Sequence, residues 1–361
     1  MNYCLDISAA PYGTGVSRYT TNLARALSST IGFSDTFSLF GSSLRQFTQL
    51  KTIADSINAD KKYLYLLPPR TTSVLFNQLN LPIDSFIGKQ DLFHGWDWYL
   101  PRGINTKVVT TVHDLALFKF PNIAHPDIKK HHHQVMLRIK KNHTHVIAVS
   151  EATKKDLIEL FDINPDQIKV IYEALPEESK IIPSTDDIAK VSLKYAINKP
   201  YLLMVGTLEP RKNYPRQILA WQQLKHDFDL VIVGKPGWEK IQPEPGLIQI
   251  GYASGNELAS LYRGAQSLLY CSLAEGFGLP MLEAFFHQLP VITSNISSLS
   301  EISDGSAVKV DPNDIEAIVD GIKKSIDMKD SLIKKGTDRL KDFSWGNAAK
   351  ETFSFYKKAI E

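Results

Sequence analysis

The feature of this sequence that most constrains its fold is the alternation of short apolar runs with longer segments of helical periodicity. The runs are bounded by turn residues and are apolar throughout, which indicates strands buried on both faces of a sheet. They span residues 3–7, 107–112, 145–149, 201–205, 230–233, 268–271 and 290–293, and helical spacing covers residues 16–27, 152–161, 216–224, 257–263 and 280–287. This order predicts an α/β fold with parallel sheets covered by helices.

The chain of 361 residues is longer than one ordinary core needs and suits two domains of roughly 100–200 residues each. Residues 173–198 interrupt the alternation with Pro176, Pro183 and no strand pattern, so we place the connection between the domains there. Residues 1–178 then form the first domain and residues 179–341 the second. The aromatic-rich residues 342–361 predict a final helix, for which packing back on the first domain is one option.

The balance of charge is nearly even, with 41 basic and 39 acidic residues and a formal net charge of +2. Nothing in this balance calls for a nucleic-acid partner. Cys4 and Cys271 both lie in apolar runs, which favours buried free thiols over a disulfide or a pair of metal ligands. The first residues show no signal-peptide pattern, and no apolar stretch approaches the roughly 20 residues that span a bilayer. We therefore expect a cytoplasmic protein whose membrane contact, if any, is peripheral.

Two cations follow the apolar run at residues 201–205, in the stretch Thr207-Leu-Glu-Pro-Arg211-Lys212-Asn213. Adjacent basic residues are often a solvated surface pair. Here they come directly after a strand, and open α/β sheets bind ligands beyond the carboxyl ends of their strands. The position therefore favours an anion site.

A second motif, Glu275-Gly-Phe-Gly-Leu-Pro-Met-Leu-Glu283, places a glycine-rich turn before a helix whose Pro280 suits the first helical position. The N–H groups and the dipole at such a helix start favour an anion, so a diphosphate fits both motifs. The two carboxylates cannot bind phosphate, and we expect Glu275 and Glu283 to accept hydrogen bonds from the hydroxyls of a sugar and a ribose. Together the motifs predict a nucleotide-sugar site. The plainer alternative is an acid before a helix and one exposed residue of an amphipathic helix.

Eight of the ten histidines lie between His94 and His145. His113 follows the run at residues 107–112, again at the end of a predicted strand, and is a candidate site residue. The run from His131 to His133 cannot converge on one metal ion if it is helical, because consecutive positions point in different directions, and a solvated helix face is favoured. Residues 119–145 hold six Lys or Arg against one Asp and have an apolar side. Such a segment either packs on a sheet, which is the commoner case, or rests on an anionic membrane.

Two other patterns are incomplete. Gly13 and Gly15 follow the first run, but Arg18 stands where a dinucleotide-binding fingerprint has its third glycine, which argues against an NAD-dependent dehydrogenase. Asp227 and Asp229 resemble a carboxylate pair that holds a divalent metal. They immediately precede a predicted strand, so a role in entering that strand is favoured.

The order of the motifs resembles the retaining glycosyltransferases of family 4, which have the GT-B fold. The resemblance covers nearly the whole chain and rests on residues 13–19, 111–114, 149–153, 205–213, 251–252 and 275–283, followed by residues 290–295 and 311–312. It implies two Rossmann-like domains whose parallel sheets face a central cleft. The chain departs from the family at residues 172–176, where an Asn-Gly turn is usual, and at residues 286–288, where a small residue and a glycine are usual.

The resemblance also implies roles for individual residues. Arg211 and Lys212 would neutralise the donor diphosphate, Glu283 would hold the ribose, Glu275 would face the sugar, and His113 would lie beside the sugar across the cleft. The catalytic set would be His113, Arg211, Lys212 and Glu275, and the donor-binding set would be Gly15, Gly206, Thr207, Arg211, Lys212, Tyr252, Glu275, Gly276, Phe277, Gly278, Leu279 and Glu283. No metal or cofactor is implied. Retention without an obvious enzyme nucleophile favours front-face attack.

The leading hypothesis is therefore an enzyme that moves a hexose from a nucleotide sugar to a glycan or lipid-linked acceptor of a bacterial surface polysaccharide, at the inner face of the cytoplasmic membrane. Mannose from GDP-mannose is the preferred donor on resemblance alone. A catalytically silent scaffold in a glycan-assembly complex is the alternative. The acceptor would be chosen by loops of the first domain, including residues 93–98, whose aromatic side chains would either stack on a sugar or belong to the core.

Overall fold

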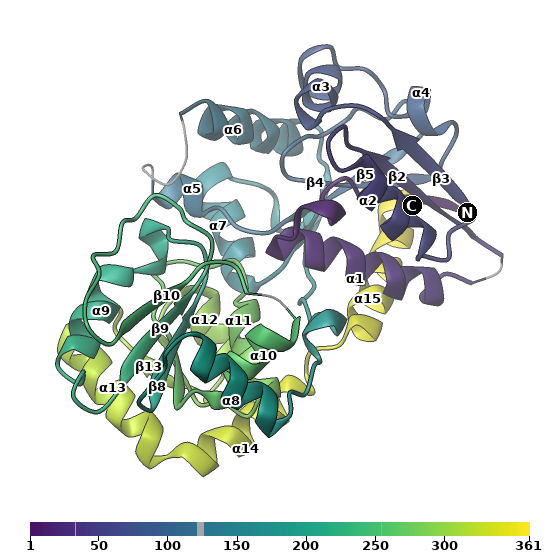
Figure 1. Cartoon of the computed structure of the whole chain (residues 1–361). Helices are drawn as coiled ribbons and strands as arrows, with labels where there is room; N and C mark the ends of the chain where they lie inside the picture. The colour runs from purple at the N-terminus through teal and green to yellow at the C-terminus, as the bar shows by residue number, and fades with distance from the viewer. Residues whose placement is uncertain (33, 121–125, 254) are drawn as a thin grey trace. The chain divides into compact units, whose positions relative to one another are not determined.

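The structure is a computed structural model that describes all residues except 33, 121–125 and 254 (Figure 1). The described residues form two compact units. Unit 1 contains residues 1–115, 126–174 and 344–361, and unit 2 contains residues 116–120 and 175–343. Apart from the short segment that begins at Ala116, the chain leaves unit 1 after Ala174 and returns to it at Ser344.

Unit 1 is built on a seven-stranded sheet in the order β3-β2-β1-β4-β5-β6-β7, in which every pairing is parallel. Tyr3 of β1 lies opposite Phe37 of β2 on one side and Leu92 of β4 on the other. The strands are β1 (Asn2–Asp6), β2 (Thr36–Ser42), β3 (Lys61–Tyr65), β4 (Leu92–Trp96), β5 (Lys107–Val112), β6 (His145–Ala148) and β7 (Ile168–Val170). The helices are α1 (Gly15–Thr30), α2 (Phe47–Asp55), α3 (Pro69–Ser73), α4 (Asp84–Ile87), α6 (Pro126–Lys141), α7 (Glu151–Phe161) and α15 (Trp345–Ile360).

Helix α15, from the end of the chain, belongs to unit 1 and lies beside α1 (Figure 1). Ser344 caps its first turn by accepting a hydrogen bond from the backbone N–H of Asn347. Tyr356 is buried, stacks on Tyr3 and hydrogen-bonds Nδ1 of His94 through its hydroxyl at 2.6 Å. The aromatic residues of this segment therefore complete the core of unit 1.

Residues 93–98 were expected to lie in a loop, with aromatic side chains that either stack on a sugar or belong to the core. The prediction of a loop was wrong for residues 93–96, and the core alternative is confirmed for Phe93 and Trp96. Residues 92–96 are strand β4, which lies between β1 and β5, and Phe93, His94 and Trp96 are fully buried. Burial lowers the pKa of His94 to about 3, and its Nε2 is 2.8 Å from the hydroxyl of Thr111. A neutral, hydrogen-bonded histidine can sit in a central strand, but it interrupts the apolar pattern by which buried strands are found. Of this segment, Trp98 is half-buried and stacks on Trp96.

Unit 2 is built on a six-stranded parallel sheet in the order β10-β9-β8-β11-β12-β13. Its core includes Leu202, Met204, Trp221 and Ile232, and helices pack in the pairs α9 with α13, α8 with α10 and α11 with α14. The strands are β8 (Tyr201–Val205), β9 (Asp229–Val233), β10 (Leu247–Ile250), β11 (Ser267–Tyr270), β12 (Val291–Ser294) and β13 (Val308–Val310). The helices are α5 (Ala116–Lys119), α8 (Thr185–Lys194), α9 (Tyr214–Gln222), α10 (Gly255–Gly264), α11 (Leu279–Phe286), α12 (Ser297–Ser303), α13 (Ile315–Asp327) and α14 (Lys329–Leu340).

The seven strands and five helices predicted from the sequence are confirmed, with ends that differ by a few residues. The four edge strands, β3, β7, β10 and β13, were not predicted, because an edge strand is partly exposed and lacks a continuous apolar run. The inner strand β2 was not predicted either, because Ser38, Gly41 and Ser42 interrupt its apolar run. Helix α8 was also not predicted, although Ser184 and Asp187 form a capping box at its start. It occupies the stretch assigned to the connection between domains.

Both cysteines are free and buried, as predicted, and burial raises the pKa of each thiol. Asp229 begins β9 and accepts hydrogen bonds from the backbone N–H groups of Asn198 and Lys199, in agreement with the predicted strand-entry role. Within the described parts of the chain, no helix is long and apolar enough to cross a bilayer.

The histidine run is only partly a solvated face. Val135, Met136 and Ile139 bury the apolar side of α6, as a helix packed on a sheet requires. Nε2 of His131 is 2.6 Å from the carbonyl oxygen of Trp98, and burial lowers the pKa of His132, whereas His133 is exposed. The prediction was wrong for His131 and His132 because the polar side of α6 faces the loop after β4.

Gln288 stands where the family pattern has glycine and adopts φ +57°, in the left-handed region that costs a non-glycine residue roughly 1 kcal/mol. We expect Gln288→Gly to stabilise unit 2 by about 0.5–1 kcal/mol, because glycine enters this conformation without strain. Urea unfolding measures the change. Gln134→Gly, an exposed position inside α6, is the control and should destabilise the protein by a similar amount. Destabilisation by both variants would contradict the prediction.

Candidate functional site

The predicted site in unit 2 lies where the strand order reverses. Strands β8 and β11 are neighbours at the centre of the sheet, and the chain continues outward from them in opposite directions. The carboxyl ends of two such strands diverge into a crevice, which is the usual ligand site of an open parallel sheet. The two sequence motifs follow β8 and β11, so the topology brings them to one place.

The loop after β8 is held tightly against its surroundings. A Cβ on Gly234 would lie 1.8 Å from the carbonyl oxygen of Gly206, so the two backbones touch. Residues Pro210–Lys212 form a short 3-10 helix that ends at Asn213, which has φ +59°. The Nδ2 of Asn213 donates to the carbonyl oxygens of Cys271 at 3.1 Å and Pro312 at 2.7 Å. These bonds fix Arg211 and Lys212 beside the loop that follows β11.

Glu275 bridges the two cations. Its Oε2 is 2.5 Å from a terminal nitrogen of Arg211, and its Oε1 is 2.6 Å from Nζ of Lys212. Glu209 adds a second carboxylate, with Oε2 2.8 Å from Nε of Arg211. The cluster of Glu209, Arg211, Lys212 and Glu275, which we call the charge cluster, has two positive and two negative groups and no formal net charge. Glu209 was not predicted as a site residue, although the alternation of charge in its motif was a usable signal.

All four groups of the charge cluster are mostly buried, and the side chain of Glu275 is only 7% exposed. Burial acts to raise the pKa of Glu275, but the charges of Arg211 and Lys212 outweigh it and lower the pKa to about 2. Burial also lowers the pKa of Lys212, and Glu275 opposes that shift. Each ionised group therefore keeps its neighbour ionised.

The turn after Glu275 leads into α11 as predicted. Gly278 has φ +117°, and a Cβ there would lie 3.0 Å from the side chain of Leu299, so both backbone and space favour glycine. Helix α11 starts at Leu279, and Phe277 is buried against Phe343. The backbone of residues 276–279 is thus positioned at the helix start, next to the charge cluster.

Glu283 is 2% exposed, so it is not the exposed residue of an amphipathic helix. Its Oε2 accepts a hydrogen bond from the hydroxyl of Tyr262 at 2.7 Å, and its Oε1 accepts one from the hydroxyl of Ser179 at 2.9 Å. A carboxylate oxygen can accept more than one hydrogen bond. Ser179 and Tyr262 were not predicted, and no local sequence signal links them to Glu283.

Thr207 and Tyr252 were also predicted to bind the donor. Thr207 is half-buried at the start of the loop after β8. Tyr252 follows the edge strand β10, is 64% exposed and has its ring 5.4 Å from Nζ of Lys235. The described contacts do not join Tyr252 to the charge cluster.

In unit 1 the strand order reverses between β1 and β4. Gly15 begins α1 beyond β1, behind Thr14, which caps the helix together with Ser17. A Cβ on Gly15 would have no atom within 4 Å, so its backbone is open to approach by a ligand. His113 follows β5, the next strand beyond β4. The structure therefore places both residues at the carboxyl edge of their own sheet.

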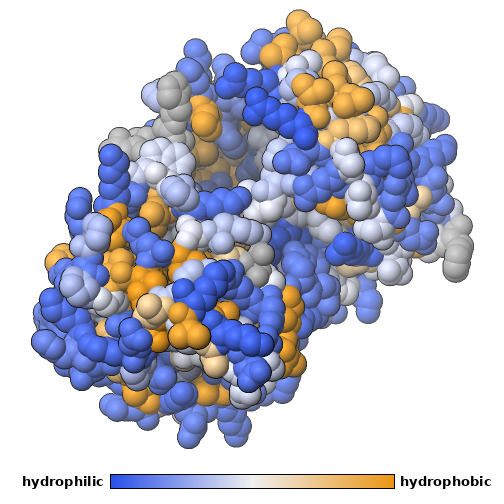
Figure 2. All heavy atoms as spheres, in the orientation of Figure 1, coloured by the Kyte–Doolittle hydropathy of each residue, from blue (hydrophilic) through white to orange (hydrophobic). Residues whose placement is uncertain are grey.

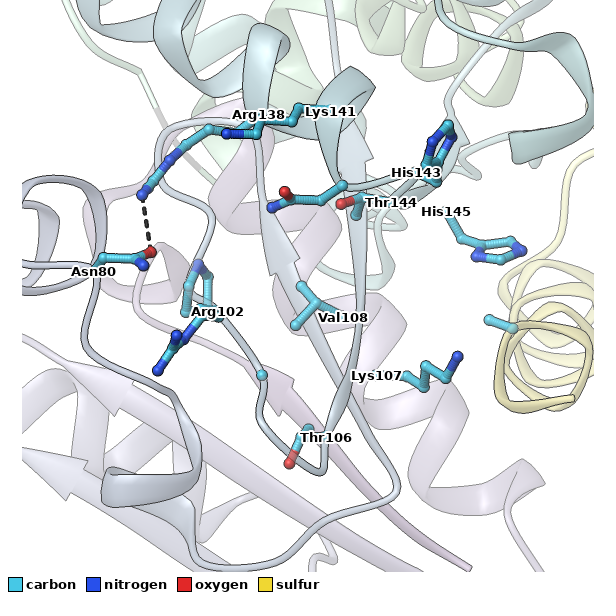
Figure 3. Close-up of a pocket in the computed structure, with 14 residues that line it drawn as sticks. Asn80, Arg102, Thr106, Lys107, Val108, Arg138, Lys141, His143, Thr144 and His145 are labelled. Atoms are coloured by element: carbon cyan, nitrogen blue, oxygen red, sulfur yellow. Dashed lines mark hydrogen bonds between the residues drawn. The ribbon is translucent and has the colours of Figure 1, made fainter.

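A separate hollow of about 630 Å³ lies at the opposite edge of this sheet, where β5 and β6 begin (Figure 3). Figure 3 shows basic side chains around Val108, and Arg138 donates to Oδ1 of Asn80 at 2.9 Å. Arg138 and Lys141 belong to the last turn of α6, where cations offset the helix dipole. The basic lining residues are Arg102, Lys107, Arg138, Lys141, His143 and His145. None of the predicted site residues is among the described lining residues.

Comparison with protein families matches both units. Residues 13–178 match the family described as Glycosyltransferase Family 4, and residues 186–339 match the family described as Glycosyl transferases group 1. The chain is 31% identical over 287 residues to O-antigen chain mannosyltransferase B of Escherichia coli, covering 74% of each protein. It is 28% identical over 232 residues to O-antigen chain mannosyltransferase RfbU of Salmonella typhimurium, covering 62% of each.

Solved structures resemble the chain over nearly its whole length. Sucrose-phosphate synthase from Thermosynechococcus elongatus has a TM-score of 0.74 at 18% identity, covering 99% of this chain and 98% of that structure. WaaG, a glycosyltransferase involved in lipopolysaccharide biosynthesis, has a TM-score of 0.68 at 13% identity, covering 98% and 99%. At these identities the likeness establishes the fold, the GT-B arrangement of two Rossmann-like domains with parallel sheets.

The lowered pKa of Glu275 predicts how stability depends on pH. A carboxylate with a lowered folded-state pKa contributes stability that is complete above its usual pKa of 4.5 and is lost as the pH falls toward about 2. At 1.36 kcal/mol per pKa unit, Glu275 contributes about 3 kcal/mol to the free energy of unfolding. We expect Glu275→Gln to be less stable than the native protein by about this much at pH 7, because Lys212 and Arg211 both lose the Glu275 carboxylate and only Arg211 keeps its ion pair with Glu209. As the pH falls from 5 to 2, the stability of the variant should decrease less than that of the native protein.

Urea unfolding at a series of pH values measures this dependence. Glu159→Gln is the control, since Glu159 is exposed and lies 3.7 Å from Lys155 in a surface pair worth less than about 0.5 kcal/mol. Parallel curves for the native protein and Glu275→Gln would show that Glu275 is not paired as the structure indicates.

Proposed function

Because this chain belongs to the family 4 glycosyltransferases, we propose that it moves mannose from GDP-mannose to a glycan or lipid-linked acceptor of a bacterial surface polysaccharide. The observation that carries the site assignment is the meeting of two cations, two carboxylates and a helix start at the point where the unit 2 strand order reverses. The choice of mannose and of an O-antigen or capsule-type glycan is supported by the named relatives of Escherichia coli and Salmonella typhimurium.

In this proposal the donor enters the charge cluster and rearranges it. The diphosphate pairs with Arg211 and Lys212 and with the N–H groups of residues 276–279, which offer partial positive charge. Glu275 then exchanges its ion pairs for hydroxyls of the sugar, and Glu283 accepts a hydrogen bond from the ribose. Gly206 and Thr207 line the phosphates, and Tyr252 lies toward the nucleoside.

The proposed reaction retains the anomeric configuration. The bond between the sugar C1 and the phosphate oxygen breaks, the acceptor oxygen attacks C1 from the same face, and its proton passes to a phosphate oxygen of the leaving nucleoside diphosphate. Charge develops on the phosphate, and fixed cations lower the barrier at that point. Arg211 and Lys212 fill the role of a divalent metal here, so the reaction is proposed to be independent of metal. His113 in unit 1 takes the role that the resemblance implies, contact with the transferred sugar.

For the acceptor, unit 1 offers a hollow of about 890 Å³ beside Trp98, with Val74 and Ile128 as apolar neighbours and Gln78 and His131 as polar ones. A stacking ring with hydrogen-bonding groups around it suits a sugar. Figure 2 shows hydrophobic side chains gathered over α3 and α4, and the exposed ones in this part of the chain are Leu66, Val74, Leu79 and Leu81. Such a patch supports peripheral contact with lipid at the cytoplasmic face of the membrane.

One observation favours the alternative of a catalytically silent scaffold. Glu209 and Glu275 already neutralise both cations, so the charge cluster presents no net positive charge to a diphosphate. A scaffold would keep the cluster as a structural element. Nucleotide binding separates the two proposals.

We expect GDP and GDP-mannose to raise the melting temperature in a panel of nucleoside diphosphates and nucleotide sugars, because a ligand that binds only the folded state stabilises it. EDTA should leave this shift and the rate of transfer unchanged. Stabilisation by UDP compounds instead would reassign the donor, and the absence of stabilisation by any nucleotide would favour the scaffold.

Substitution of a cation and substitution of a carboxylate in the charge cluster should have different effects on binding and transfer. We expect Lys212→Gln to weaken GDP binding by about 10-fold or more, since one charge-assisted contact is worth about 1.5–3 kcal/mol. Glu275→Gln should bind GDP at least as tightly as the native protein, because the cations are released, but should lose about 100-fold in kcat as the sugar contact disappears. Calorimetry and transfer assays measure both quantities.

The control for these variants is Lys334→Gln with Lys335→Gln, two exposed positions of α14 that should change neither quantity. Nuclear magnetic resonance of the product gives the anomeric configuration, and an inverted linkage would overturn the retaining mechanism. Equal loss of GDP binding in Lys212→Gln and Glu275→Gln would contradict the assigned division of roles.

A further inference from the structure

Glu173 is a buried carboxylate outside the charge cluster. It follows β7 by three residues, is 5% exposed, and its Oε1 lies 3.5 Å from Nδ1 of His113. Burying a carboxylate is costly, and a well-packed apolar pair would serve stability as well as a buried ion pair does. Stability alone therefore gives no reason for Glu173.

His113 is held from several directions. Its backbone N–H points to Oδ2 of Asp97 at 3.4 Å, and its carbonyl oxygen accepts a hydrogen bond from the hydroxyl of Thr153 at 3.3 Å. Its ring packs edge to face on Tyr19, with centroids 4.8 Å apart, and lies 5.9 Å from the ring of Trp96. Tyr19 of α1 and Trp96 of β4 thus hold the ring, Thr153 of α7 holds the backbone, and Glu173 lies beside one ring nitrogen.

The other ring nitrogen is unused. Nε2 of His113 is buried and hydrogen-bonds to none of the residues that the structure describes. A carboxylate at Nδ1 keeps the proton on that nitrogen and so fixes the tautomer. Nε2 is therefore the nitrogen left for a substrate, at the carboxyl edge of the sheet.

The charged groups that face His113 are mostly acidic. They are Glu173 from the segment after β7, Asp97 from the loop after β4 and the neighbouring Asp114. Burial acts to lower the pKa of His113, but the hydrogen bond and charge of Glu173, with the charges of Asp97 and Asp114, outweigh it and raise the pKa. His94 of β4 and Tyr19 of α1 are the remaining titratable neighbours; burial keeps His94 neutral by lowering its pKa and raises the pKa of Tyr19.

We infer that Glu173 is a positioning residue for the transfer reaction, which acts through Nδ1 of His113 to orient the ring and to favour the imidazolium. Nε2–H is then presented as a hydrogen-bond donor to the transferred sugar or to the leaving phosphate. Glu173 itself touches no substrate. This inference rests on the proposed function, because it takes His113 as the residue that meets the donor.

The test compares Glu173→Gln, Glu173→Asp and Glu173→Ala with the native protein. Glutamine keeps an acceptor for Nδ1–H but removes the charge, and alanine removes both. We expect kcat to fall about 10-fold to 100-fold in Glu173→Gln and further in Glu173→Ala, with partial recovery in Glu173→Asp. GDP binding and the KM for the donor should stay within about twofold, because unit 2 holds the nucleotide.

The pH profile separates positioning from a structural role. In the plot of kcat against pH, kcat should decrease as His113 loses its proton. Removing the negative charge of Glu173 should move this decrease to lower pH by about one unit or more. The protonated ring is the active form, so Glu173→Gln should lose activity at a lower pH than the native protein does as the pH is raised. Nuclear magnetic resonance of ¹³C-labelled histidine, assigned with His113→Gln, should show the same shift in the protein without substrate.

Two further variants complete the test. The double variant His113→Gln with Glu173→Gln should be no slower than His113→Gln alone, because Glu173 acts only through His113. Asp166→Asn, an exposed carboxylate between α7 and β7, is the control and should leave kcat and the pH profile unchanged.

The outcomes distinguish this inference from the proposed function. If the native protein transfers no hexose, the proposed function is wrong and the inference falls with it. If the native protein transfers a hexose while Glu173→Gln keeps the native kcat and pH profile, only the inference is wrong. A loss of kcat that adds to that of His113→Gln, with an unchanged profile, would also overturn it, because Glu173 would then be structural.

Discussion

The contact of Glu275 with Arg211 and Lys212 is the interaction on which the site of unit 2 depends. It joins the loop after β8 to the loop after β11, so it fixes both motifs in one crevice. Burial lowers the pKa of Lys212, and Glu275 opposes that shift, while Arg211 and Lys212 together hold the pKa of Glu275 below its usual value. The same ion pairs therefore stabilise the folded loops and set the charge state of the site.

This balance has a consequence for function. A site with two cations and two carboxylates has little attraction for a phosphate at a distance, and a ligand must offer hydroxyls to the carboxylates as well as phosphates to the cations. A nucleotide sugar offers both, whereas inorganic phosphate offers one. In the proposed function, the charge cluster thereby favours the whole nucleotide sugar over inorganic phosphate, which is a form of specificity built from paired charges.

Unit 1 repeats the arrangement with different chemistry. Its strand order also reverses near the centre of the sheet, and its polar groups also follow the carboxyl ends of the strands. There, a carboxylate from the segment after β7 meets a histidine from the end of β5. In both units the parallel sheet is a rigid support that brings distant loops together, and the chemistry resides in the loops.

The amino-acid sequence by itself determined the α/β class, the inner strands other than β2 and β4, the turn at residues 276–278 and the identity of most charged residues of the site, because most buried strands and glycine turns leave local patterns. The strand β4 was missed because His94 interrupts its apolar run, and the partners that allow His94 to be buried, Thr111 and Tyr356, are distant in sequence. The edge strands were missed because they are half exposed. Only the tertiary structure decided that Glu209 and Glu275 neutralise the cations, that Ser179 and Tyr262 hold Glu283, and that Glu173 meets His113. Those pairs join residues brought together by sheet order and loop packing, and such contacts leave no periodic signal along the chain.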